Sequence, residues 1–267
     1  MLKSRLIFTL LYDNSLFALS RNFRLQKVGN LDWLNKNYNF RQIAHFIDEI
    51  IVLDVSREER NTGAFCMMLH ELTKGCFSPV SAGGGVRSMS HADALFKAGA
   101  DKVVVNTALF DSPDLILRLS ERYGQQSLVG SIDYKRDLEG SYQIFVENGS
   151  RRLRGSIRAE LVGSSVANVG ELYINSIDRD GTGQGYDFGI LNEIPEELKV
   201  PLIMAGGAGN SLHLQEGLSY PGIDAVATAN LLNFVGDGLE RSRRDLIKSG
   251  VDLVDWSAPE NILTLGS

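Results

Sequence analysis

Short runs of apolar residues, rich in Val, Ile and Leu, recur eight times along this 267-residue chain. They are Leu6–Leu11, Glu49–Val55, Val80–Ala82, Lys102–Asn106, Leu128–Asp133, Glu171–Ile177, Leu202–Ala205 and Asp224–Thr228. Continuous apolar runs of this length are typical of strands that are buried on both faces. Such strands occur mainly in parallel sheets, so the runs predict a chain built from crossover units.

Stretches with helical periodicity lie between the runs. Ser90–Ala98 is expected to be a helix, with Ser88 or Ser90 as its N-cap and Gly99 ending it. Pro113–Tyr123 is a second expected helix, because proline favours the first turn. Eight strand–helix units predict one (β/α)8 TIM barrel over residues 1–267, which suits this length. A doubly wound open sheet is the structural alternative.

Two segments interrupt this rhythm. Between Tyr134 and Ser156 the pattern predicts a hairpin with an Asn148-Gly149 turn, inserted after the fifth strand. After the first strand, Leu25–Trp33 is expected to be a long loop. Both segments follow strands, so they are expected on the C-terminal face of the barrel, where such barrels carry their chemistry.

An internal repeat divides the predicted barrel into halves, at about residues 1–122 and 123–250. Ala82-Gly-Gly-Gly85 recurs as Ala205-Gly-Gly-Ala208, and the same offset carries Asn106 and Thr107 onto Ala229 and Asn230. The offset also carries Gly99 and Asp101 onto Gly222 and Asp224. Two equivalent half-barrels explain this pattern.

The repeated segments favour anion binding. Glycines at strand ends let backbone N–H groups approach a phosphate closely, and the following turns add further donors. The polar run Ser176-Ile-Asp-Arg-Asp-Gly-Thr-Gly183 follows the sixth predicted strand. Two such sites across the barrel mouth would hold a ligand with two phosphates. The plainer interpretation is that the glycines form only tight turns.

The composition limits the other function classes. The net charge of −6 argues against nucleic acid as a partner, because phosphate backbones bind basic surfaces. The longest early apolar run, Leu6 to Tyr12, is too short to span a membrane. Cys66 and Cys76 are expected to be reduced thiols, and the four histidines share no metal-ligand spacing. A cytoplasmic protein without a metal or cofactor is therefore expected.

Taken together, these segments resemble the cyclase subunit of imidazole glycerol phosphate synthase, the HisF family of histidine biosynthesis, over nearly the whole chain. The resemblance is carried by Met1-Leu-Lys-Ser-Arg5-Leu-Ile, Leu53-Asp54, Ala82-Gly-Gly-Gly-Val86, Gly99-Ala-Asp-Lys-Val103, Val105-Asn-Thr-Ala108, Ser131-Ile-Asp133, Ser176-Ile-Asp-Arg-Asp-Gly-Thr182 and Ala205-Gly-Gly-Ala-Gly209. The run that ends at Thr182 is the most specific of these.

The resemblance implies a mechanism and a partner. A glutaminase subunit would dock on the N-terminal face of the barrel, and its ammonia would pass through the barrel to the C-terminal face. There it would attack a bisphosphorylated ribulosyl intermediate. Two aspartates, at the ends of strands one and five, would act as general acid and base.

Carried over by position, the strand-five aspartate is Asp133, the expected catalytic residue. The expected phosphate contacts are Gly85, Asn106, Thr107, Asp180, Gly181, Gly207, Ala229 and Asn230. The expected ring of charges at the ammonia entrance is Arg5, Glu49, Lys102 and Glu171.

The sequence departs from the family pattern at strand one, where the pattern ends in Asp. Here the residues are Phe8-Thr9-Leu10-Leu11, and leucine cannot exchange a proton. Asp13 follows two positions later, in what is expected to be a loop. Loss of one acid of such a pair costs on the order of 10²–10⁴-fold in rate.

A divergent branch of the family shares this leucine. It resembles barrel proteins of bacterial surface-polysaccharide clusters, which act with a glutaminase-like partner and a sugar amidotransferase to build acetamidino groups. The first hypothesis is therefore an ammonia-delivering subunit for a phosphorylated, sugar-linked substrate. The alternatives are a true histidine-pathway cyclase/lyase and a non-catalytic scaffold that activates the glutaminase.

Overall fold

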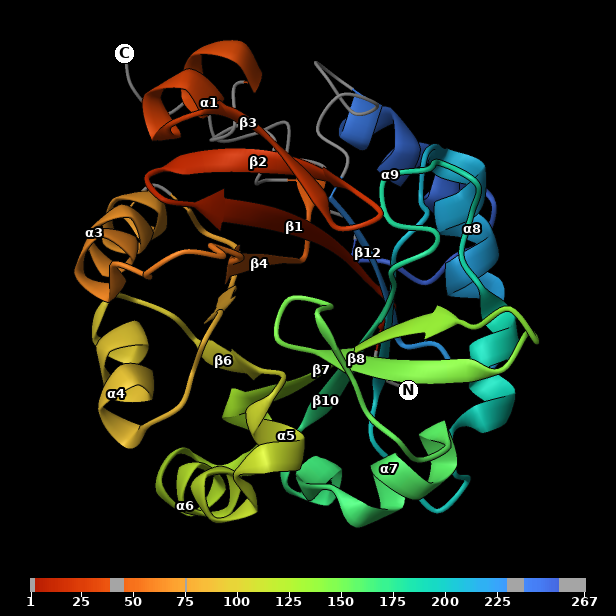
Figure 1. Ribbon diagram of the computed structural model, residues 1–267. Coiled ribbons are helices and arrows are strands. Elements are labelled where there is room, and N and C mark those ends of the chain that lie inside the picture. Colours follow the sequence, from red (N-terminus) through yellow and green to blue (C-terminus); the bar gives the residue numbers. More distant parts are fainter. Residues whose placement is uncertain (1–2, 39–45, 75, 230–237, 255–267) are drawn as a thin grey trace, which may run out of the picture.

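The computed structural model describes residues 3–38, 46–74, 76–229 and 238–254. Eight parallel strands close into a barrel with helices outside it, as Figure 1 shows in a view along the barrel. The barrel strands are β1 (Arg5–Asp13), β4 (Glu49–Asp54), β5 (Val80–Gly83), β6 (Lys102–Val105), β7 (Leu128–Arg136), β10 (Glu171–Ser176), β11 (Leu202–Ala205) and β12 (Ala225–Thr228). Each pairs with the next in this order, and β12 pairs with β1 to close the sheet. The predicted TIM barrel is confirmed, and the open sheet is excluded.

Helices and short 3-10 turns connect the strands on the outside. They are α1 (Leu31–Tyr38), α3 (Thr62–Thr73), α4 (Met89–Lys97), α5 (Ala108–Asp111), α6 (Pro113–Tyr123), η2 (Gln125–Ser127), α7 (Ile157–Gly163), η3 (Ser165–Asn168), η4 (Phe188–Glu193), α8 (Ser211–Ser219) and α9 (Gly238–Lys248). The Ser88 side chain accepts from the His91 N–H, so Ser88 is the N-cap of α4 and the alternative, Ser90, lies within the helix. Helix α6 has the predicted bounds.

The eight apolar runs become strands because each has two apolar surfaces to bury. Side chains that point outward pack against the helices in one large core. Side chains that point inward form a second, smaller cluster inside the barrel, which includes Ile7, Ile51, Val104 and Tyr173. Alternation of side chains along each strand supplies both clusters from the same residues.

Matching contacts in the two halves support the half-barrel repeat. The Asp101 carboxylate accepts from the Val80 N–H at 2.8 Å, and the Asp224 carboxylate accepts from the Leu202 N–H at 2.9 Å. Gly84 and its equivalent Gly207 have nearly the same positive φ, +115° and +112°. A Cβ at either position would collide with the backbone, so only glycine fits these two turns.

The two irregular segments are more structured than the sequence suggested. Leu25–Trp33 is not a loop, because it contributes most of strand β3 (Arg24–Gly29) and the start of α1; β3 pairs with β2 (Leu16–Arg21). Alternation is hard to recognise in these exposed edge strands. After the fifth barrel strand, β7 continues into a three-stranded extension with β8 (Tyr142–Val146) and β9 (Arg151–Arg152). The predicted Asn148-Gly149 turn joins β8 to β9, whereas a separate turn at residues 137–140 joins β7 to β8.

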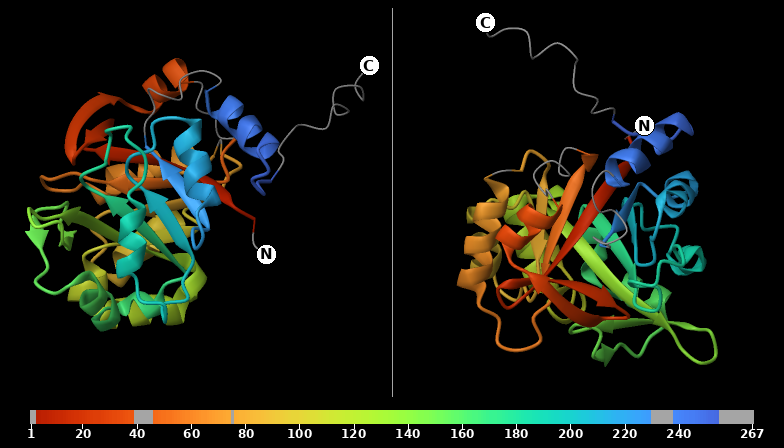
Figure 2. Two further views of the ribbon diagram at one scale, coloured as in Figure 1. Left: turned by 90° about the vertical axis from the view of Figure 1, so that its right-hand side faces the viewer. Right: turned by 90° about the horizontal axis from the view of Figure 1, so that it is seen from above.

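Both additions stand at the same end of the barrel. In the left view of Figure 2 the β2–β3 and β8–β9 segments lie opposite the end at which β1 begins. They therefore surround the C-terminal mouth, as expected. No helix in the described part of the chain is long and apolar enough to cross a membrane.

Candidate functional site at the barrel mouth

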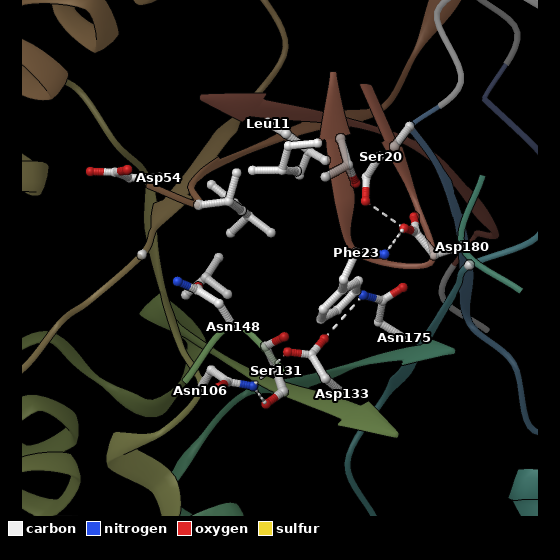
Figure 3. Close-up of a pocket in the computed structure, with 18 of the residues that line it drawn as sticks. Leu11, Ser20, Phe23, Asp54, Asn106, Ser131, Asp133, Asn148, Asn175 and Asp180 are labelled. Atoms are coloured by element: carbon white, nitrogen blue, oxygen red, sulfur yellow. Dashed lines mark hydrogen bonds between the residues drawn. The ribbon is translucent and has the colours of Figure 1, made fainter. Parts of the chain in front are cut away.

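A cavity of about 570 Å³ opens at the C-terminal mouth of the barrel. Strand ends and the two additional hairpins line it, and Figure 3 shows ten of its side chains labelled. Of the predicted site residues, it gathers Gly85, Asn106, Thr107, Asp133, Asp180, Gly181, Gly207 and Ala229. Asn230 lies outside the described residues. Residues from distant segments of the sequence thus meet around one space.

Asp133 is a half-buried carboxyl group on the wall of this cavity. Asn175 Nδ2 donates to its Oδ1 at 3.0 Å, and Asn106 Nδ2 donates to its Oδ2 at 3.1 Å (Figure 3). Burial, together with the nearby Asp180 carboxylate, outweighs the two amide donors and raises the pKa of Asp133 to about 7. A carboxyl group with a pKa near neutrality can both accept and donate a proton.

The two ends of the predicted ligand site have different partners. At one end, Thr107 Oγ1 accepts from the Glu147 N–H at 3.1 Å, so the β8–β9 turn closes over this part of the cavity. At the other end, Asp180 accepts from Ser20 Oγ at 2.5 Å and from the Phe23 N–H at 3.0 Å. Both donors belong to the β2–β3 hairpin, and an ionised carboxylate can accept from both at once. Asp180 therefore holds this hairpin over the mouth of the cavity. Burial raises the pKa of Asp180.

Leu11 stands at the strand-one position for which the family resemblance implies an aspartate. Leu11 lines the cavity on the side opposite Asp133 (Figure 3). Asp13 does not take over the role of the missing acid, because it lies outside the cavity wall and pairs with Lys27 at 3.3 Å. It is also the last residue of β1, not a loop residue as expected. Asp133 therefore has no carboxyl partner on strand one.

The four charged residues predicted at the barrel entrance meet at the opposite end of the barrel. Arg5 bonds to Glu49 at 3.0 Å and to Glu171 at 2.9 Å. Lys102 bonds to the same two carboxylates, at 2.9 and 2.8 Å. The charges alternate around a closed ring, and Ser81 Oγ adds a hydrogen bond to Glu49. Ser81 was not among the residues predicted for this ring.

The electrostatics of the ring favour its ionised form. Burial acts to lower the pKa of Arg5, but its bonds to Glu171 and Glu49 outweigh this and raise it. Burial likewise acts to raise the pKa of Glu171, whereas Arg5 and Lys102 together lower it. Each charged group pairs with two neighbours of opposite charge, so the four side chains form a closed, charged cap at the N-terminal end of the barrel interior.

Sequence reasoning missed several residues of the site. Asn175 bonds to Asp133, and the alternation along β10 places it on the same inward face as Glu171 and Tyr173. That period of two was the signal that could have found it. The cavity is also lined by five arginines, Arg21, Arg24, Arg57, Arg60 and Arg87. They come from separate segments of the chain, so their convergence has no local sequence signature.

Within the described residues, no group of three or more His, Cys, Asp or Glu side chains is placed to hold a metal ion. Cys66 and Cys76 are both free thiols, and burial raises the pKa of each. His91 contacts the Gly85 carbonyl at 3.1 Å, next to the cavity. The candidate functional groups among the described residues are therefore the polar side chains of the cavity at the barrel mouth and the four charged residues of the ring.

Comparison with known proteins gives one family match and several similar proteins. A family described as "Histidine biosynthesis protein" matches residues 34–236. A protein of Parasynechococcus marenigrum, provisionally named imidazole glycerol phosphate synthase subunit hisF2, is 47% identical over 257 residues, covering 96% of this chain and 95% of its own. A protein of Pseudomonas aeruginosa with the same provisional name is 36% identical, covering 71% of this chain and 76% of its own. Imidazole glycerol phosphate synthase subunit HisF of Pyrobaculum aerophilum is 36% identical, covering 77% of this chain and 81% of its own.

Proposed function

The chain belongs to the HisF family of imidazole glycerol phosphate synthase subunits, and we propose that it receives ammonia from a glutaminase and delivers it to a phosphorylated acceptor. The observation that carries this proposal is the closed ring of Arg5, Glu49, Lys102 and Glu171. It lies at the N-terminal end of the same barrel whose other end holds the Asp133 cavity.

The interior between ring and cavity suits ammonia. Most of its side chains are apolar, among them Ile7, Ile51, Val104 and Val129, although Thr9 and Tyr173 share a hydrogen bond within it. A neutral molecule enters such a layer at far lower cost than a cation, so the ring side would retain ammonium while ammonia passes. The glutaminase would dock over the N-terminal face, around the ring.

At the mouth, the acceptor would bind through its phosphates at the two glycine turns, with Asp133 in reach of the reacting atoms. Asp133, whose pKa is raised to about 7, would transfer the proton that accompanies ammonia addition. The cavity of about 570 Å³ is within the usual size range of small-ligand sites.

We propose further that the acceptor is a sugar of surface-polysaccharide synthesis, which a sugar amidotransferase converts to an acetamidino form. Leu11 supports this, because it removes the second acid that ring closure would use. The test is to purify the chain with a glutaminase-like partner, the amidotransferase and the sugar acceptor, and to measure amidine product from glutamine. Product that forms equally well without this chain would exclude the proposal.

A histidine-pathway cyclase/lyase is the second candidate, and the intact Asp133 with its two amide partners favours it. This candidate predicts turnover of the bisphosphorylated ribulosyl intermediate with ammonium salts alone. No turnover by the wild-type protein would exclude it. A scaffold that only activates the glutaminase would instead lose no pathway output in an Asp133→Asn variant, while a Lys102 substitution would reduce that output.

A further inference from the structure

Arg60 occupies an unusual place beside the first glycine turn. It follows β4, and its half-buried side chain lies along the cavity wall next to Gly85. Gly85 has a φ of +65°, and a Cβ there would come within 3.0 Å of Arg60 Cδ and Nη1. The bare glycine therefore makes room for a guanidinium group as well as for a turn.

The hydrogen-bond donors of Arg60 are poorly satisfied. Nη2 reaches Asn148 Oδ1 at 3.3 Å, a long bond. Nε is buried and has no hydrogen-bond partner, and it is the only such buried side-chain nitrogen or oxygen among the described residues. A buried donor without a partner costs free energy, so a folded protein rarely keeps one without a reason.

The nearest carboxylate does not supply that partner. Asp54 Oδ1 stands 4.0 Å from Arg60 Nε, beyond hydrogen-bonding distance, and accepts instead from the Ser56 N–H at 3.0 Å. Asp54 thus balances part of the charge of Arg60 and leaves its terminal nitrogens, Nη1 and Nη2, available.

The donors of Arg60 lie close to the other polar groups at this end of the cavity. Asn148 bonds to Arg60, and its neighbour Glu147 bonds to Thr107 through its backbone N–H. One turn of the β8–β9 segment thus holds Arg60 and Thr107 on the same side of the cavity. Gly84, Gly85 and Asn106 line the same cavity.

We propose that Arg60 is the cation that binds a phosphate monoester at the Gly84–Gly85 turn. This inference rests on the proposed function in taking the ligand to be phosphorylated, but not on the ammonia route. Guanidinium presents two parallel N–H groups to two oxygens of a dianionic phosphate, and such charge-assisted bonds are about twice as strong as neutral ones. The terminal nitrogens Nη1 and Nη2, of which only Nη2 has a hydrogen-bond partner among the described residues, would donate these bonds.

The other arginines of the cavity make a matched comparison possible. Arg87 lines the same cavity, but its side chain is exposed, so water screens its charge. Arg60→Met and Arg87→Met each remove one positive charge from the cavity, and only the first removes the buried donors. Arg60→Lys keeps the charge and removes the planar fork.

The experiment is a calorimetric titration of each full-length protein with inorganic phosphate, together with the shift in Tm that phosphate produces. Arg60→Met is expected to weaken phosphate binding tenfold or more and to lose most of the Tm shift. Arg60→Lys should give an intermediate loss, and Arg87→Met should change the Kd less than twofold. Circular dichroism and glutaminase binding serve as folding controls for every variant.

Several outcomes would overturn the proposal. An Arg60→Met protein that binds phosphate within twofold of wild type would show that its donors serve another purpose. Equal losses in the Arg60→Met and Arg87→Met proteins would show that only the general charge of the mouth matters. A wild-type protein without phosphate binding would remove both this inference and the phosphate part of the proposed function, whereas a failure of glutaminase coupling alone would leave Arg60 binding intact.

Discussion

Replacing Asp133 with asparagine should change how the stability of the protein depends on pH. The carboxyl group is half-buried, and its pKa in the folded protein is about 7 against 3.8 for an unperturbed group. The unfolded chain therefore releases this proton at a lower pH than the folded protein does. Between the unfolded and folded pKa values, each rise in pH lowers the unfolding free energy of the wild type. Above about pH 8 this carboxyl group causes no further loss of stability.

The size of the effect follows from the shift. Each pKa unit corresponds to about 1.4 kcal/mol, so the shift gives an upper limit of about 4 kcal/mol. Because Asp133 also faces an open cavity, we expect about half of this, or about 2 kcal/mol. The Asp133→Asn variant lacks the titration, so it should gain about 2 kcal/mol relative to wild type between pH 4 and pH 8. At this chain length that corresponds to a Tm difference of about 4–8 °C.

The assay is thermal and urea unfolding of both proteins at several pH values from 4 to 8.5. The side-chain amide of the variant must reorient one of the two neighbouring amides, but that cost is the same at every pH and leaves the slope unaffected. All other titrating groups are present in both proteins, so their contributions largely cancel in the difference between the two unfolding free energies. A stability difference that stays constant across this range, or that favours the wild type more as pH rises, would refute the raised pKa of Asp133.

Three further predictions concern the ring, the missing acid and the glycine turns. Lys102→Met leaves two carboxylates sharing one arginine, so it should lower the free energy of unfolding in urea by about 2–3 kcal/mol. It should also reduce the glutamine-dependent yield of product more than the ammonium-dependent yield. Arg118→Met on α6 is the control, and equal effects of the two substitutions would exclude a special role of the ring. Leu11→Asp introduces a second acid opposite Asp133 and should raise ammonium-dependent turnover of the bisphosphorylated ribulosyl intermediate by on the order of 10²-fold, measured by loss of substrate. No gain in turnover would show that a second acid at this position is not sufficient for the reaction. Gly84→Ala places a Cβ 2.2 Å from the Asp54 carbonyl oxygen, whereas Gly140 also has a positive φ but open space around the added Cβ. Gly84→Ala should therefore lower the free energy of unfolding by about 1–3 kcal/mol more than Gly140→Ala does. Equal unfolding free energies of the two variants would contradict this.

The barrel was predictable because its strands are buried on both faces and so appear as continuous apolar runs. All eight runs became strands, and their ends differ from the predicted ones by a few residues at most. The β2–β3 hairpin was not predictable in this way, because its exposed strand β3 carries few apolar residues. Its position depends on Asp180, which is distant in sequence.

The candidate site followed partly from the sequence. The glycine turns were visible as a repeat, and Asp133 and the charged ring came from the resemblance to the family. Asn175 and Arg60 were missed, since their importance depends on contacts with Asp133 and Gly85 that only the closed barrel brings about. Contacts between loops far apart in the chain leave no local pattern in the sequence.

We propose that a glutaminase docks at the ring end of the barrel. Hydrogen exchange measured by mass spectrometry, with the protein alone and mixed with the glutaminase encoded in the same genome, tests it directly. We expect slower exchange of backbone amides around Arg5, Glu49, Lys102 and Glu171, and unchanged exchange in the β2–β3 and β8–β9 hairpins. Protection confined to those hairpins, or no protection at all, would contradict it.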